Sequence, residues 1–169
     1  MDDFKFDEND PEGMFGNPLG ESGNGDSEEA DEEKAVGVAG VYEHRSDEPN
    51  KTSEFVVLLR DDIGRTVLIV IGKFEAMAIS LALEGHSADR PLTHDLLNNV
   101  IGRLGGSLRR ILIDDLWNDT YYAKITIDTA AGEMVVDSRP SDAIALALRA
   151  KAPIYMLESV LREAGLKAE

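Results

Sequence analysis

Residues 53–71 read SEFVVLLRDDIGRTVLIVI, and this stretch decides the fold. Phe55–Leu59 and Val67–Ile71 are apolar runs rich in β-branched residues, and Asp61–Gly64 between them has the composition of a turn. Two such runs around a turn predict an antiparallel hairpin. Because both runs are apolar at odd and even positions alike, we expect both strands to be central in a sheet, with each face covered.

The chain from Val36 onward alternates between strand and helix patterns. We expect further strands over 36–44, 107–113, 121–128, 133–137 and 154–156, and helices over 75–83, 93–104, 140–150 and 157–164. Thr93 suits a helix N-cap, Pro140 a first helical turn, and Gly105 the position after a helix end. Residues 114–119 are expected to form a connection, because Asp and Asn favour turns.

Two helical segments resemble each other. Glu75–Leu81 aligns with Asp142–Leu148 at an offset of 67 residues, and each follows a hairpin and precedes an X-Pro-apolar step. The order of three strands and two helices therefore occurs twice. These patterns predict an α+β fold in which a duplicated β-β-β-α-α unit forms one compact single domain, with its helices packed on a sheet. Chance similarity between apolar helices is the alternative.

Acidic side chains are concentrated near the start of the chain. Residues 1–54 hold 17 of the 33 Asp and Glu residues but only 4 of the 17 Lys and Arg residues. Residues 1–35 also contain several Gly and Pro residues, so they are expected to form a disordered acidic tail, and residues 36–169 the folded domain. The tail either keeps the protein soluble, competes for a basic surface or docks a partner through its Phe and Met side chains.

The composition excludes several classes of protein. The chain has no Cys, which excludes disulfide frameworks and zinc–thiolate sites. No run of about 18 apolar residues is present, so no membrane span is expected, and the first residues lack the basic segment of a secretory signal, which makes the cytoplasm the expected location. The formal net charge of −16 argues against broad binding to a phosphate backbone.

Four sequence motifs follow one another along the second two thirds of the chain. They are Leu68–Gly72 with Glu75 and Ala76, Arg90–Leu96, Arg139–Ala147, and Pro153–Tyr155. In this order they resemble the bifunctional nuclease family, and the resemblance extends over about residues 54–165. It implies cleavage of both DNA and RNA, a cytoplasmic bacterial setting, and an α+β fold that associates as a homo-oligomer.

Nuclease chemistry needs carboxylates that hold Mg²⁺ or Mn²⁺, or a His base, together with cations near the phosphate. Asp137, Arg139 and Asp142 lie where a strand passes into a helix, and Glu75 occupies the position of Asp142 in the apparent repeat. We therefore expect Asp137, Asp142 and Glu75 to hold the metal ion, and Asp142 and Arg139 to act in catalysis. The alternative is structural: a neighbouring Ser caps the helix, and Arg139 pairs with a carboxylate.

A second group of polar residues lies around the start of the helix at residue 93. His94 and Asp95 can supply an imidazole and a carboxylate to a metal ion or a water molecule, so both are candidate catalytic residues. A capped helix start with a hydrogen-bonded His is the alternative. The candidate nucleic-acid contacts are arginines of the folded part: Arg90, Arg103, Arg109 and Arg110. The alternative is that these arginines are ordinary solvent-exposed charges at the edge of a strand or helix.

Two functions are compatible with these residues. The first is a metal-assisted nuclease that cleaves the phosphodiester bonds of DNA and RNA with little sequence preference. The second is a non-catalytic module, an oligomeric scaffold or a regulatory binding protein, in which the motif around Asp142 orders the fold. An open cleft around Asp137, Arg139 and Asp142 would favour the first function, and a buried, mutually satisfied cluster the second.

Overall fold

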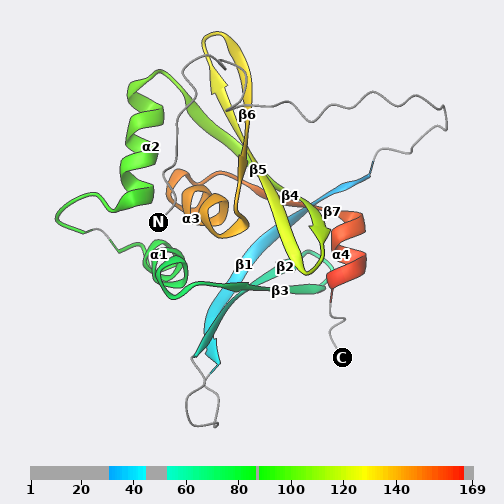
Figure 1. Cartoon of the computed structure of the whole chain (residues 1–169). Helices are drawn as coiled ribbons and strands as arrows, with labels where there is room; N and C mark the ends of the chain where they lie inside the picture. The colour runs from blue at the N-terminus through cyan, green and yellow to red at the C-terminus, as the bar shows by residue number, and fades with distance from the viewer. Residues whose placement is uncertain (1–30, 45–52, 87, 166–169) are drawn as a thin grey trace, which may run out of the picture.

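The computed structural model describes residues 31–44, 53–86 and 88–165 (Figure 1). They form an α+β domain with one mixed seven-stranded sheet and four helices, which confirms the predicted fold class. The strands are β1 (Glu33–His44), β2 (Glu54–Asp61), β3 (Thr66–Ile71), β4 (Ser107–Trp117), β5 (Thr120–Thr129), β6 (Gly132–Ser138) and β7 (Ile154–Leu157). The helices are α1 (Lys73–Leu83), α2 (Thr93–Arg103), α3 (Pro140–Ala150) and α4 (Glu158–Ala164).

The predicted tail, residues 1–35, overlaps the start of β1. This strand begins at Glu33, before the expected start at Val36, and its first residue pairs with Leu157 of β7. The rest of the predicted tail, residues 1–30, lies outside the described residues. Among the residues that the structure describes, no helix has the length and apolar character needed to cross a membrane.

The strand order in the sheet is β3-β2-β1-β7-β4-β5-β6. Two antiparallel three-stranded meanders, β1–β3 and β4–β6, flank β7, which runs antiparallel to β1 and parallel to β4. Each meander leads into a helix, as the apparent repeat predicts. β7 has no counterpart among the described residues of the first half, so the duplication itself stays a prediction.

Helix α3 forms the centre of the core. It begins at Pro140, as expected, and the side chains of residues 143–147 are all fully buried. It contacts β4 and β5, and α1 and α2 lie on either side of it (Figure 1). Burying side chains of the size of Ile144 and Leu146 contributes about 1.5–3 kcal/mol each. The N-terminal end of α3 is therefore held on a well-packed base.

The prediction that both strands of the first hairpin are covered on each face is wrong for β3. This strand lies at an edge of the sheet. Its residues Val67 and Ile69 are buried, but Leu68 is 41% and Val70 69% exposed. The physical reason is that the sequence shows only that both faces of the strand are apolar. It does not show whether other parts of the same chain cover both faces.

Strand β4 extends further than the sequence predicts. Asp114 and Asp115, which were expected in a connection, are strand residues, and β4 continues to Trp117. The turn is confined to Asn118 and Asp119, whose φ angles of 48° and 58° match a two-residue hairpin turn. A bulge in the pairing of β4 with β5 accommodates the two acidic residues within the strand.

Of the two residues predicted to mark the ends of α2, one has the predicted role and one does not. Gly105 follows the helix with a φ of 82°, and the N–H of Gly106 donates to the carbonyl of Ile101 at 2.9 Å, as in a Schellman motif. The expected N-cap, Thr93, is instead the first helical residue, and Leu92 occupies the cap position. Leu92 has no side-chain acceptor, so the start of this helix needs another partner.

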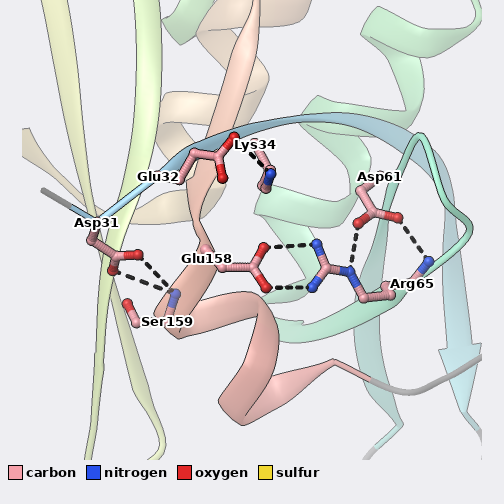
Figure 2. Close-up of polar contacts among 7 residues, drawn as sticks. All are labelled: Asp31, Glu32, Lys34, Asp61, Arg65, Glu158 and Ser159. Carbon is pink, nitrogen blue, oxygen red and sulfur yellow. Dashed lines mark hydrogen bonds and ion pairs between the residues drawn. The ribbon is translucent and has the colours of Figure 1, made fainter. Parts of the chain in front are cut away.

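Arg65 forms hydrogen bonds that link the β2–β3 turn to the start of α4 (Figure 2). Its Nε donates to Asp61 Oδ2 at 2.7 Å, and its Nη1 and Nη2 donate to the two oxygens of Glu158 at 2.7 and 2.9 Å. The Asp61 side chain is fully enclosed, and the Arg65 side chain is 20% exposed. Burial alone would raise the pKa of Asp61, but the bonds from Arg65 hold it below its ordinary value. We call these three side chains the Arg65 network.

The first described residues cap α4. The N–H of Ser159 lies 3.2 and 3.4 Å from the two carboxylate oxygens of Asp31 (Figure 2). The N–H of Glu158 donates to the carbonyl of Glu32 at 2.8 Å. A helix as short as α4 is not stable alone. It therefore depends on Asp31, Glu32 and the Arg65 network.

Candidate functional site

Four charged or titratable side chains meet near the N-terminal ends of α1, α2 and α3: Glu75, His94, Arg139 and Asp142. We call them the Arg139 site. Arg139 Nε donates to Asp142 Oδ2 at 2.7 Å, and Arg139 Nη2 lies 3.3 Å from Glu75 Oε1. The other oxygen of Asp142, Oδ1, lies 3.1 Å from His94 Nε2. Three distant segments of the chain thus bring together two carboxylates, one guanidinium and one imidazole.

Helix geometry places Arg139 beside Asp142. Arg139 is the extended N-cap residue of α3, and Asp142 follows three residues later, which turns its carboxylate back towards Arg139. Neither Ser138 nor Ser141 caps this helix with its side chain, and the Ser138 hydroxyl donates to the carbonyl of Arg139 at 3.0 Å. The serine cap considered from the sequence is therefore wrong, whereas the Arg139–Asp142 ion pair is present.

Glu75 has the same position in α1 that Asp142 has in α3. Each is the third residue of its helix, and the residue before α1 is Gly72. A Cβ atom on Gly72 would collide with the carboxylate of Glu75. Glycine at this position therefore lets the Glu75 side chain fold back over the helix end, towards Arg139.

The electrostatics of the site keep Asp142 ionised. Burial alone would raise the pKa of Asp142, but the bonds from Arg139 and His94 hold it below its ordinary value of 3.8. The bond to Asp142 in turn raises the pKa of Arg139. The Arg139 side chain is 67% exposed, whereas those of Asp142 and His94 are 32% and 12% exposed. The site thus presents a cation to solvent and keeps its carboxylate and imidazole further inside.

Two pockets adjoin the site, and Arg139 and Glu75 line both of them. The first has a volume of about 600 Å³ and is also lined by His94 and Asp142; we call it the His94 pocket. The second, of about 680 Å³, lies between β3, α4 and the start of α3; we call it the Tyr121 pocket. Pockets of this size hold small organic ligands.

Two exposed apolar side chains of α1 line the His94 pocket. Phe74 is 78% and Met77 54% exposed. An exposed aromatic ring beside a cation suits the stacking of a nucleic-acid base. Phe74 was not among the predicted site residues, because one Phe in an apolar helix carries no signal of its own. Its only cue is that it lies next to Glu75 at the start of the helix.

The Tyr121 pocket lies where the sheet curls towards its own edge. The hydroxyl of Tyr121 on β5 donates to the carbonyl of Leu68 on the edge strand β3 at 3.3 Å. Burial raises the pKa of Tyr121, and the nearby carboxylates of Glu163 and Asp119 raise it further. Arg139 is the cation that balances these carboxylates in the pocket lining.

The three predicted metal ligands do not form a metal site in this chain. Asp137 is an exposed residue of β6, in register with Lys124 on β5, whereas Glu75 and Asp142 both pair with Arg139. Across residues 31–44, 53–86 and 88–165, no three His, Asp or Glu side chains are grouped closely enough to hold a metal ion. The described residues therefore include no grouped set of ligands for Mg²⁺ or Mn²⁺.

Asp95 contacts the other end of α3. Its Oδ2 accepts the N–H of the cap residue Leu92 at 3.0 Å, and its Oδ1 accepts Arg149 Nε at 2.6 Å. Burial alone would raise the pKa of Asp95, but these two bonds hold it below its ordinary value. Asp95 thus fixes α2 against α3 and so positions His94. The sequence analysis did not find Arg149, whose position in an apolar helix gave no signal.

The four candidate nucleic-acid contacts differ in how far they are neutralised. Arg109 pairs with Glu133 at 2.6 Å, and Arg110 pairs with Glu33 and lies over the ring of Tyr155. The other two, Arg90 and Arg103, are exposed and form no ion pair with the part of the chain that the structure describes: their charges are open to a phosphate.

Comparison with known proteins agrees with the motifs. A family model described as the bifunctional nuclease domain matches residues 56–169. An uncharacterised protein of Mycobacterium tuberculosis is 46% identical over 112 residues, which are 66% of each chain. Bifunctional nuclease 1 of Oryza sativa subsp. indica is 28% identical over 116 residues, 66% of this chain and 35% of that protein. Bifunctional nuclease 2 of Arabidopsis thaliana is 21% identical over 118 residues, 68% of this chain and 36% of that protein. The match thus spans just under two thirds of the mycobacterial protein and about a third of the plant proteins.

Proposed function

Because this chain belongs to the bifunctional nuclease family, we propose that it is a nuclease that cleaves phosphodiester bonds of DNA and RNA with little sequence preference. The observation that supports this proposal best is the row of contacts from His94 through Asp142 to Arg139, beside an open pocket. A mutually satisfied buried cluster would instead have favoured the scaffold function. Here the guanidinium is largely exposed.

In the proposed reaction His94 acts as the general base. Asp142 binds its Nε2, which orients the ring and stabilises the imidazolium that forms when Nδ1 accepts a proton from the attacking water or hydroxyl group. Arg139 donates to Asp142 through Nε and approaches Glu75 through Nη2, so Nη1 is left for an oxygen of the phosphate. A guanidinium in this position stabilises the negative charge that grows on the phosphate in the transition state.

Dependence on Mg²⁺ or Mn²⁺ remains part of the proposal, as the sequence led us to expect. No step above passes through a divalent ion, because the residues described do not form a site for one. Cleavage in EDTA therefore separates a metal-independent reaction from one that needs an added ion. A cytoplasmic location is likewise proposed, and cell fractionation tests it.

The test of the proposal is digestion of plasmid DNA and of single-stranded RNA by the wild type and by Asp142→Asn, in EDTA, Mg²⁺ and Mn²⁺. We expect the variant to lose cleavage by at least about 100-fold, since His94 loses its carboxylate. The matched control is Asp128→Asn, which changes an exposed carboxylate that lies near Arg109. A folded Asp142→Asn protein that cleaves like the wild type would contradict the assignment.

We also propose that the protein is a homo-oligomer. None of the eleven residues of α2 is buried, although a helix normally gains its stability by burying one face. Three apolar side chains of α2 and that of its C-cap residue Leu104 are at least 43% exposed and lie on one flank of the helix; the three are Leu96, Leu97 and Val100. A second copy of the chain, with the same apolar flank, can cover them without bringing charged groups of the two acidic chains together.

Sedimentation at micromolar concentration tests this association. The wild type should sediment as a dimer or larger species, and Val100→Glu should sediment as a smaller one, because the charge cannot be buried in an apolar contact. Glu substitution of Ile63, which is 73% exposed in the β2–β3 turn, is the control. A monomeric wild type would contradict this part of the proposal.

A further inference from the structure

One pocket of the domain is lined by cations without any carboxylate. It has a volume of about 690 Å³ and lies between α2, the C-terminal end of α3 and the start of β4. Its polar lining residues are Asn98, Asn99, Arg103, Ser107 and Arg149. The other pockets described above each include Asp or Glu side chains. In a protein with a net charge of −16, two arginines facing a cavity without an acidic residue mark a place for an anion. We call it the Arg149 pocket.

Arg149 is fixed before any ligand arrives. Its side chain is only 9% exposed. Its Nε donates to Asp95 at 2.6 Å and its Nη1 donates to the carbonyl of Ala145 at 2.8 Å, so Nη2 takes part in neither bond. A cation that is already held in one geometry loses little conformational entropy when it binds.

Arg103 adds an exposed cation to this fixed one. It is exposed and forms no ion pair within the described ranges, as noted above. Both arginines lie in the last turns of their helices, where they also offset the helix dipoles. The helix dipoles explain why an arginine stands at the end of each helix. They do not explain why the same cavity is also lined by two side-chain amides and by no carboxylate. An amide can donate hydrogen bonds to a phosphate oxygen, as an arginine does.

The pocket and the Arg139 site lie along the same helix. His94 is near the start of α2, and Asn98 and Arg103 follow it by four and nine residues. With a rise of about 1.5 Å per residue and about 3.6 residues per turn, Arg103 is about 13 Å further along the axis and about half a turn around it. A strand that keeps the stacked spacing of about 3.4 Å per phosphate covers this axial distance in about four nucleotides, and it must also pass around α2 to reach Arg103.

We propose that the Arg149 pocket binds a backbone phosphate of a single-stranded nucleic acid whose scissile bond lies at the Arg139 site. Arg149 and Arg103 supply the charge, and Asn98 and Asn99 supply amide donors. This inference rests on the proposed nuclease function, because it assigns a second contact to the same substrate. Asn98 lies on the side of α2 that faces away from the apolar flank, whereas Asn99 and Arg103 are three and seven residues from Leu96 and lie at the edge of that flank.

The test uses one variant that adds a carboxylate to the pocket and one that removes a cation from it. Asn98→Asp and Arg103→Gln are compared with the wild type for binding of a cleavage-resistant phosphorothioate 12-mer, and for cleavage of a normal 12-mer and of a dinucleotide. We expect Asn98→Asp to weaken binding of the 12-mer by about tenfold. Arg103→Gln should weaken it by a few-fold, and the salt dependence of its binding constant should correspond to about one phosphate contact fewer. Dinucleotide cleavage should fall less than 12-mer cleavage in both variants, because a dinucleotide does not reach the pocket.

The matched control is Asn118→Asp, which makes the same chemical change at the opposite end of β4. If Asn98→Asp and Arg103→Gln, both folded by thermal melting, bind the 12-mer within twofold of the wild type, the inference is overturned. A wild type that binds the 12-mer but cleaves nothing contradicts the nuclease proposal. In that case the 12-mer affinities of the two variants still test whether the pocket binds a phosphate. A wild type that does not bind the 12-mer at all overturns the inference as well.

Discussion

Two networks in this domain are built from nearly the same parts, an arginine between two carboxylates. In the Arg65 network all three guanidinium nitrogens donate to carboxylate oxygens, and the side chain is 20% exposed. In the Arg139 site only two of the three nitrogens contact carboxylates, and the side chain is 67% exposed. The second network also includes His94 and adjoins two pockets.

The difference teaches that exposure and unused donors, and not the ionic composition, decide what such a network can do. A guanidinium whose donors are all engaged and enclosed can only hold its neighbours together. One with a donor left over at a pocket can bind an anion as well. We therefore expect changes to the Arg65 network to affect stability, and changes to the Arg139 site to affect cleavage.

The largest effect should come from His94→Asn. Loss of the proposed general base should lower the cleavage rate by about 10²–10⁴-fold, while the melting temperature changes little. Initial rates on single-stranded RNA and a thermal melt measure both. His86→Asn, at an exposed His after α1, is the control and should cleave like the wild type. A stable His94→Asn protein with full activity would remove His94 from the mechanism.

The next effect should be the loss of stability in Asp61→Asn. This change leaves Arg65 partly buried with one fewer negative partner, which should cost about 3 kcal/mol in the free energy of unfolding. The same change at the more exposed Asp142 should cost less than about 1 kcal/mol. Urea unfolding of the two variants measures the difference. Equal losses in both would mean that the two networks have the same structural role.

A smaller effect is expected from two truncations around the start of β1. Removal of residues 1–30 should leave the free energy of unfolding nearly unchanged, because an acidic segment rich in Gly and Pro buries little apolar surface. Removal of residues 1–35 takes away the Asp31 cap of α4 and the pairs of Glu33, Lys34 and Ala35 with β7. The cap alone is worth about 1 kcal/mol. Equal stability of the two truncated proteins would show that these contacts do not stabilise the Arg65 network.

The smallest effect should appear as a dependence on pH. The pKa of Asp61 is lower in the folded protein than its ordinary value of 3.8, so its contribution to stability is present above pH 3.8 and is lost as the pH falls through the folded value. The stability difference between the wild type and Asp61→Asn should therefore narrow below pH 3.8. Urea midpoints between pH 6 and pH 3 measure it. A difference that grows towards low pH would contradict the assigned direction of the shift.

Much of the fold could be predicted from local signals. The two apolar runs around Asp61–Gly64, the proline that begins α3 and the glycine after α2 each specify a local conformation, and all three are in place. The exposure of β3 could not be predicted in this way. Periodicity identifies which faces are apolar, but only the packing of the whole chain decides that Leu68 and Val70 stay uncovered.

In the candidate site, too, contacts between residues close in the sequence could be predicted, and contacts between separate segments could not. Arg139 and Asp142 are three residues apart on one helix, so their contact follows from sequence spacing. The contact of His94 with Asp142 and that of Asp95 with Arg149 join separate helices, and no spacing in the sequence reveals them. Asp137 appeared close to Asp142 along the chain, but it lies on β6 in register with Lys124.

Strand β7 has a consequence for the order in which the domain folds. Each three-stranded meander consists of neighbours along the chain, so each can form early and quickly. In the order of the sheet, Ile154–Leu157 lies between the two meanders, and these four residues near the end of the described chain pair with both of them. Until those residues are synthesised and inserted, β1 and β4 each have one open edge. Closure of the sheet should therefore be the slow step of folding, and the half-formed sheet the species most exposed to aggregation.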